Sequence, residues 1–227
     1  MIELRALGGL GLRDSADGHE ILSVLARSKP SGVLVYLALS PPDTNHARDK
    51  LLELLWPGST AEKARNSLNQ ALHILRRGLG PGVIGSTEGG DLFLEAGAVW
   101  CDVAAFGEAL AAGHAREALE LYGGHLWDPS DLPDCPAFER WLDGERERLR
   151  KLAVGAAVTL AQELERDGSS VDAVQWLRQA RDWAPYEQAV VRLLLKLLRG
   201  AGERAAAVRE YDEFSERLAA DLKLTPS

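Results

Sequence analysis

The alternation of hydrophobic and polar positions is most regular between residues 61 and 79. Six apolar residues recur three or four positions apart: Ala64, Leu68, Ala71, Leu72, Leu75 and Leu79. At about 100° per residue, this spacing places them on one face of a helix. Ser59 or Thr60 can cap its first turn, because a hydroxyl there accepts a hydrogen bond from an unpaired backbone amide. We therefore predict an amphipathic helix over residues 61–79.

The polar side of this helix carries amides and cations. Its members are Asn66, Gln70, His73 and Arg77 opposite the apolar face, Lys63 close to them, and Arg65, Asn69 and Arg76 along one flank. Amide and guanidinium groups are the ones that read base edges and bind phosphates in a major groove. The alternative is an ordinary amphipathic helix with a solvated outer face. The neighbouring elements decide between the two.

Three short strands are predicted before the first helix. Alternating residues indicate one strand over residues 1–7 and a second over 10–13, and a third short strand is expected over 19–22. Pro30 stands where a first helical position would be. The apolar run over residues 33–39 then predicts a helix, which ends at the Ser40-Pro41-Pro42 break. The N-terminal region is therefore expected to begin with a small sheet followed by a helix.

A second helix over residues 45–55 has a heavily apolar face and ends at Pro57-Gly58. After the helix over 61–79, apolar residues at 83–84 and 92–94 enclose a polar turn, which predicts a hairpin. Strands, three helices and a hairpin, with a tight connection between the last two helices, form the layout of a winged helix-turn-helix. In that layout the helix over 61–79 enters the major groove.

The tip of the hairpin is the candidate wing. Ser86 and Thr87 are the residues that we expect to lie along a DNA backbone. The alternative is a simple surface hairpin. Glu88 and Asp91 favour this alternative, because acids near phosphates weaken binding.

The second half of the chain reads as helical. Trp100-Cys101-Asp102 is expected to open this region, with Asp102 as the N-cap of a helix over 103–112. A partner helix over 116–122 and a loop with Trp127 as a packed connector follow. Residues 138–167 form one long helix or two continuous ones, in which the mixed charges of 145–151 lie on a solvated face.

A repeat is visible in this half. Gly168 and Ala173 stand five apart, and the same pair recurs 34 residues later as Gly202 and Ala207. A tetratricopeptide repeat places its packing residues at the positions taken here by Leu160, Ala173, Leu177, Ala180 and Pro185. About three stacked pairs of antiparallel helices are predicted, and such repeats commonly present a groove for a protein or peptide. At the last repeat, we expect Leu218, Leu222 and Leu224 to be partly exposed or covered by a neighbour.

Two segments carry a family resemblance. Residues 48–57 read RDKLLELLWP, and residues 64–77 read ARNSLNQALHILRR. This pair resembles the OmpR-type winged helix of SARP-type bacterial transcriptional activators, which a helical bacterial transcriptional activator domain follows. The resemblance implies an α+β winged helix-turn-helix domain over residues 1–97 and an all-α, tetratricopeptide-like helical-repeat domain over 98–227. It also implies binding to repeats in promoters and recruitment of RNA polymerase.

Charge is unevenly distributed between the two parts. The chain has a formal net charge of −8; residues 1–97 hold 10 Lys/Arg and 11 Asp/Glu, and residues 98–227 hold 16 and 23. Any nucleic acid should therefore bind to a local patch of the N-terminal part. A secretory signal and an apolar run of membrane-spanning length are absent from the sequence, so we expect a cytoplasmic protein that does not bind membranes. Cys101 and Cys135 are expected to be reduced, buried thiols.

Catalytic motifs are missing from the sequence. The glycine-rich stretch over residues 78–90 lacks the lysine of a P-loop, and no G-x-S-x-G or H-E-x-x-H is present. The five histidines are scattered and do not pair at metal-binding spacing. We therefore expect a protein that is not an enzyme, with no catalytic residues, no metal and no cofactor.

These observations favour a sequence-specific DNA-binding transcriptional regulator, with double-stranded DNA, RNA polymerase and a second copy of the chain as expected partners. The candidates for base contacts are Arg65, Asn66, Asn69, Gln70 and His73. The candidates for phosphate contacts are Arg48, Lys50, Lys63, Arg76 and Arg77. The alternative is a protein-interaction scaffold in which the winged helix is a docking surface. Acids from Asp102 onward, folded over the polar face, would favour that alternative.

Overall fold

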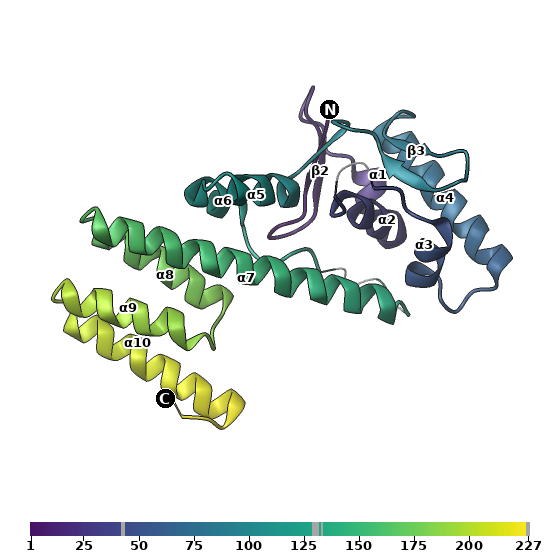
Figure 1. Ribbon diagram of the computed structural model, residues 1–227. Coiled ribbons are helices and arrows are strands. Elements are labelled where there is room, and N and C mark those ends of the chain that lie inside the picture. Colours follow the sequence, from purple (N-terminus) through teal and green to yellow (C-terminus); the bar gives the residue numbers. More distant parts are fainter. Residues whose placement is uncertain (42–43, 129–131, 133, 226–227) are drawn as a thin grey trace. The chain divides into compact units, whose positions relative to one another are not determined.

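The computed structural model describes residues 1–41, 44–128, 132 and 134–225 (Figure 1). Contacts divide the chain into two compact units. The first, the winged unit, contains Met1–Glu108 and Leu121–Arg146, and the second, the repeat unit, contains Ala109–Glu120 and Glu147–Ser227. The sequence suggested a division after residue 97, whereas by contacts the first unit also takes in residues 98–108 and 121–146.

A three-stranded sheet opens the winged unit. β1 (Ile2–Arg5) pairs antiparallel with β2 (Gly11–Asp14) on one side and parallel with β5 (Val99–Cys101) on the other. The third strand predicted over residues 19–22 is wrong: one bridge joins Arg13 and Glu20, and the chain then turns into the short helix α1 (Leu22–Leu25). β5 corrects a second expectation, because Trp100 and Cys101 belong to a strand and not to the start of a helix.

Three further helices follow α1: α2 (Ser28–Ala38), α3 (Arg48–Leu55) and α4 (Ala61–Leu79). The bounds of α4 are those predicted, and its six predicted apolar residues are all buried. The Thr60 side chain accepts a hydrogen bond from the Lys63 amide at 3.4 Å, as expected of the cap. α3 begins later than residue 45, because His46 exchanges both backbone hydrogen bonds with Leu92 instead of entering the helix.

The predicted hairpin is present as β3 (Ile84–Ser86) and β4 (Leu92–Leu94), which pair antiparallel. Through the His46 bridge, the hairpin is attached to the segment that enters α3. α2, α3 and α4 pack on one another (Figure 1). The winged helix-turn-helix predicted from the sequence is therefore confirmed.

The described part of residues 121–146 completes the core of the winged unit. Leu126 bridges to Leu7, and the Trp127 amide donates to the Ala6 carbonyl at 2.8 Å, so the connector is packed at these two residues, as predicted. The first turns of α7 (Pro136–Arg166) bury Phe138 and Leu142 fully. The sequence separation of these contacts explains why the core of the unit cannot be read from residues 1–97 alone.

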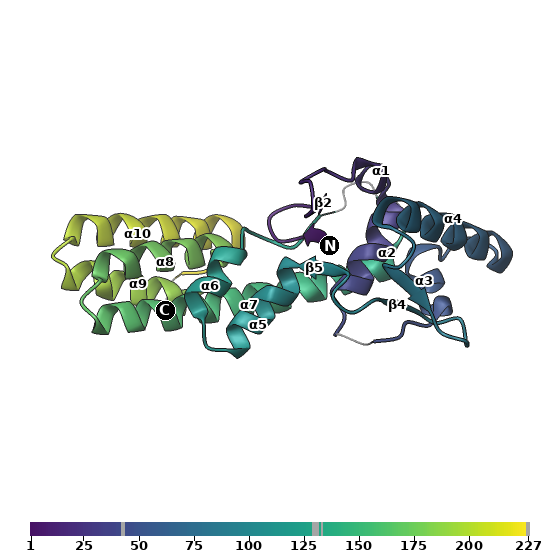
Figure 2. The ribbon, with the colours of Figure 1, turned by 90° about the horizontal axis from the view of Figure 1, so that it is seen from above.

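The helices after β5 are α5 (Asp102–Ala111), α6 (Ala115–Leu121), α7, α8 (Ser170–Trp183), α9 (Gln188–Gly200) and α10 (Arg204–Arg217), followed by the short π-helical turn η1 (Leu218–Leu222). α9 packs against both α8 and α10, and the three lie side by side (Figures 1 and 2). No helix among the described residues is long and apolar enough to cross a membrane.

The packing residues expected of a tetratricopeptide-like repeat are in place. Ala173, Leu177 and Ala180 are fully buried, and Leu160 is 7% exposed. Pro185, the fifth of them, is half-buried just after α8 ends.

The apolar residues at the end of the last repeat differ in exposure. Leu218 was expected to be partly exposed or covered by a neighbour, but it is 2% exposed and packs against Val191 and Phe214 of its own repeat. Leu222 and Leu224 are 45% and 56% exposed, as expected. Pro226 and Ser227 lie outside the described residues.

Candidate nucleic-acid interface

α4 presents its polar side to solvent. The buried apolar residues hold the helix in the winged unit, so the opposite side chains are displayed on a fixed backbone. All five candidates for base contacts are exposed: Arg65, Asn66, Asn69, Gln70 and His73. A surface hollow of about 580 Å³ is lined by Arg27, Asn66, Asn69, Gln70, His73 and Ile74. The structure therefore brings four of the five candidates together, and Arg65 lies outside the lining of the hollow.

Arg27 is the residue of this face that the sequence did not assign. It is exposed, immediately precedes α2 and reaches the hollow on α4. The sequence signal that could have identified Arg27 is its position as a cation immediately before the first long helix, α2. Lys29, two residues later, faces the core: its ammonium donates to the Leu55 carbonyl at 2.5 Å and lies 5.8 Å from the centre of the Trp56 ring.

Arg48 connects α3, α4 and the hairpin. Its Nε donates to the Gly90 carbonyl at 3.1 Å, and one terminal nitrogen donates to Asn69 Oδ1 at 2.9 Å. Because Oδ1 accepts from Arg48, the amide nitrogen is the group with which Asn69 can donate to a base. Arg48 thus positions both a candidate base reader and the turn of the hairpin.

Arg76 fixes the hairpin from the other side. Its Nε donates to the Ile84 carbonyl at 3.1 Å, and a terminal nitrogen donates to Ser86 Oγ at 3.2 Å. The structure therefore directs two candidates, Arg76 and Ser86, towards each other. Arg77, the next residue, is exposed, and its side chain has no hydrogen bond or ion pair with any described residue.

The remaining candidates differ in their surroundings. Lys63 and Lys50 are exposed, and the Lys50 ammonium lies 4.0 Å from a carboxylate oxygen of Glu53. Thr87 shapes the tip of the hairpin, because its hydroxyl accepts from the Asp91 amide at 3.1 Å and its amide donates to the Asp91 carbonyl at 2.8 Å. The Thr87 hydroxyl therefore already has a structural partner.

Acidic side chains do not line the hollow on α4. The Asp102 carboxylate lies elsewhere: it is 3% exposed and accepts from the backbone amides of Ala6 and Leu7 at 2.9 Å. Burial raises the pKa of Asp102, which the bonds from these amides oppose. Within the winged unit, Asp102 thus ties α5 to the end of β1 and does not cover the polar side of α4.

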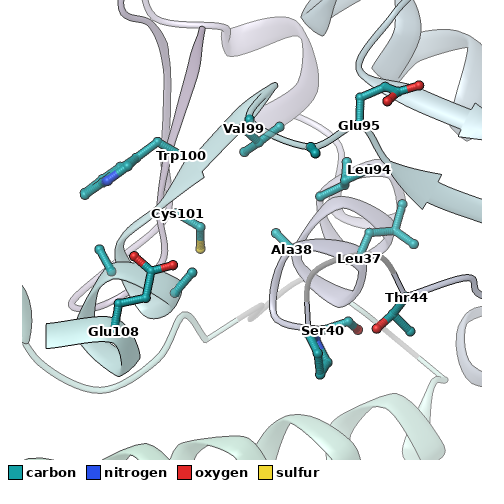
Figure 3. A pocket seen from close by; sticks show the side chains of 15 residues that line it. Leu37, Ala38, Ser40, Thr44, Leu94, Glu95, Val99, Trp100, Cys101 and Glu108 are labelled. Carbon is teal, nitrogen blue, oxygen red and sulfur yellow. The ribbon is translucent and has the colours of Figure 1, made fainter. Parts of the chain in front are cut away.

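A second cavity of the winged unit has a volume of about 280 Å³ and is bordered by α2, β4, β5 and α5 (Figure 3). Its walls include Leu37, Leu94 and Cys101. Burial, together with the charge of Asp102, raises the pKa of the Cys101 thiol to about 11, so this thiol is protonated at neutral pH. Among the described residues, no group of three or more His, Cys, Asp and Glu could hold a metal ion.

A winged helix with an exposed polar helix, followed by tetratricopeptide-like repeats, defines a class of transcription regulators. The chain belongs to the bacterial transcriptional activator domain family, which it matches over residues 102–227. The predicted SARP-type membership is thereby confirmed, and the family is one of regulators and not of enzymes.

The fold is also found in a solved structure. Mycobacterium tuberculosis EmbR in complex with a low-affinity phosphopeptide has a TM-score of 0.68 to this chain at 21% sequence identity. The match covers 100% of this chain and 62% of that one, so the chain spans less than two thirds of the length of EmbR. No curated protein matches the chain.

Proposed function

We propose that this regulator binds double-stranded DNA by docking α4 in the major groove, and that its helical repeats contact RNA polymerase or a second copy of the chain. The observation that carries the proposal is the exposed row of amides and cations on a buried, capped helix of 19 residues within a winged helix-turn-helix. Such a helix fits the major groove, and amide and guanidinium groups match the hydrogen-bonding edges of bases.

The surroundings of the helix support this role. The hollow on α4 is lined by the cation Arg27 and by amides, without an acid, although the whole chain has a net charge of −8. Lys63 and Arg77 are exposed on the same helix and can bind phosphates. The hairpin is held beside α4 by Arg48 and Arg76, so its tip can follow the DNA backbone.

The test is fluorescence anisotropy of promoter-sized duplexes across a salt series from low to physiological concentration. We expect log affinity to fall linearly with log salt, and specific competitor DNA to displace the probe better than random DNA. Arg65→Ala and Gln70→Ala should each weaken specific binding by roughly 1–3 kcal/mol. Arg166→Ala and Gln179→Ala remove matched exposed side chains from the repeat unit and should leave affinity unchanged.

Two outcomes would contradict the proposal. One is the absence of duplex binding even at low salt, which would favour the interaction scaffold. The other is an unchanged affinity and sequence preference in both α4 variants, which would remove α4 as the reading element.

A further inference from the structure

The repeat unit carries a basic hollow at α9 and the start of α10. Its volume is about 570 Å³, and it is lined by Arg192, Leu195, Lys196, Arg199, Gly200 and Arg204. The positions of these residues follow from helix geometry. Arg192, Lys196 and Arg199 are spaced by four and three, so they form one stripe that extends about 10 Å along α9.

The turn between the two helices adds the fourth cation. The Gly202 amide donates to the Arg199 carbonyl at 3.1 Å, and the Glu203 amide donates to the Leu198 carbonyl at 2.8 Å. This turn reverses the chain and brings Arg204, the first residue of α10, beside the stripe.

Most of this positive charge is not neutralised within the chain. Lys196 is paired with Glu165 at 3.1 Å. Arg192, Arg199 and Arg204 are exposed and make no side-chain hydrogen bond or ion pair with any described residue. The dipole of α9 favours a cation in the last turn of the helix, which explains the position of Arg199 but not those of Arg192 and Arg204.

Other arginines of the same unit have partners. Arg178 donates to Glu210 at 2.9 Å, and Arg181 also binds this buried carboxylate. Arg166 and Arg209 are also exposed and make no side-chain hydrogen bond or ion pair with a described residue, but they lie outside the lining of the hollow. What distinguishes the hollow is that three such guanidinium groups line one place.

Leu195 forms an apolar wall between the cations. It is half-buried and packs against a core cluster of Val191, Phe214 and Leu218. The backbone that carries the stripe is thus held by the core of the last repeat, and the hollow offers an apolar contact beside its charged groups.

We infer that this hollow binds a short acidic segment of a partner protein. Carboxylates of the segment bind the guanidinium groups of Arg192, Arg199 and Arg204, for which the planar fork of arginine is suited. An apolar side chain of the segment packs on Leu195. The inference rests on the proposed role of the repeats in protein contacts and is independent of DNA docking by α4.

The dimensions favour a peptide over a duplex. A hollow of about 570 Å³ lies in the range of small-molecule sites, about 300–1,000 Å³, so it can hold a few side chains of a peptide and is small for a duplex. The stripe is short, and the acids Glu165 and Glu203 stand beside it, so a broad polyanion would meet repulsion at the edges of the patch.

The experiment measures binding of a fluorescein-labelled peptide, in which glutamates flank leucines, to the full chain by anisotropy. A peptide with glutamines in place of the glutamates serves as the ligand control. We expect the glutamate peptide to bind and the glutamine peptide to bind at least about tenfold more weakly. Arg192→Gln and Arg199→Gln should each reduce affinity about threefold to tenfold. Arg209→Gln removes the same charge from an exposed position of α10 outside the lining and should have no effect.

Three results would overturn the inference: equal losses in the Arg209 and Arg192 variants, equal affinity for the two peptides, or no binding of the glutamate peptide. A random duplex that displaces the peptide, and binds less well to the Arg192 and Arg199 variants, would assign the hollow to DNA instead. Duplex binding is measured separately on the unaltered chain. A chain that binds the glutamate peptide but no duplex, even at low salt, would contradict the DNA-binding proposal and leave this inference standing.

Discussion

Arg76 and Arg77 form a matched pair that separates positioning of the wing from binding of phosphate. Both arginines lie in the last turn of α4, so replacing either by alanine removes one charge at nearly the same place in the helix dipole. The Arg76 side chain donates hydrogen bonds to the Ile84 carbonyl and to Ser86 Oγ, whereas the Arg77 side chain makes none with any described residue. Their variants should therefore differ in both stability and DNA binding.

The magnitudes follow from these contacts. Arg76→Ala loses two hydrogen bonds from a half-buried side chain, each with a net contribution of about 0.5–1.5 kcal/mol. The free energy of unfolding of Arg76→Ala should therefore fall about 1–3 kcal/mol more than that of Arg77→Ala. Arg77→Ala should instead lower the salt slope of DNA binding by about 0.9, the value for one lost phosphate contact. Because its guanidinium is committed to the hairpin, Arg76→Ala should leave this slope nearly unchanged.

Urea unfolding, hydrogen exchange of the amides in β3 and β4, and the salt series measure these effects. Arg76→Ala should speed exchange across the hairpin, and Arg77→Ala should not. Equal reductions of the salt slope in the two variants would refute the reasoning, since they would show that Arg76 leaves the hairpin to bind phosphate. Ser86→Ala provides a further control, because it removes one of the two bonds without changing charge.

Two more predictions concern stability of the winged unit. Asp102→Ala leaves the buried amides of Ala6 and Leu7 without their acceptor and should lower the free energy of unfolding by about 2–4 kcal/mol; an unchanged urea midpoint would show that these amides find other acceptors. Burial lowers the pKa of His46 in the folded protein, so the unfolded chain binds a proton at His46 more readily than the folded one. The contribution of the neutral His46 to the free energy of unfolding is therefore lost as the pH falls from about 7 to 5. His46→Phe should flatten the pH dependence of the unfolding midpoint over this range, and identical pH profiles would contradict the assignment.

The sequence predicted elements whose signals are local. The bounds of α4 follow from its apolar spacing and the Thr60 cap, and the hairpin follows from two short apolar segments around a polar turn. β5 was missed because three residues give little pattern, and its pairing partner, β1, lies almost a hundred residues earlier in the chain. The strand expected over residues 19–22 is too short to carry a pattern: its residues do not alternate, and it forms a single bridge, from Glu20 to Arg13, before α1 begins.

Helix periodicity predicted which side of α4 faces solvent, and it could not predict what each side chain meets there. Arg76 and Arg77 differ by one position, yet one reaches the hairpin and the other does not. Arg48 and Asn69 are 21 residues apart, and their bond depends on the crossing of two helices. Arg27 reaches the hollow on α4 for the same reason, because α2 is placed against α4 by packing that no single helix encodes.

The pairing of β5 with β1 limits how this protein can be recombined with its relatives. The match to the family begins at residue 102, whose carboxylate holds the end of the first strand. A chimera joined at residue 97 would separate β1 from β5 and remove Phe138 and Leu142 from the core of the winged unit. A graft that exchanges the winged helix between members of this family should therefore carry residues 98–108 and 121–146 together with it.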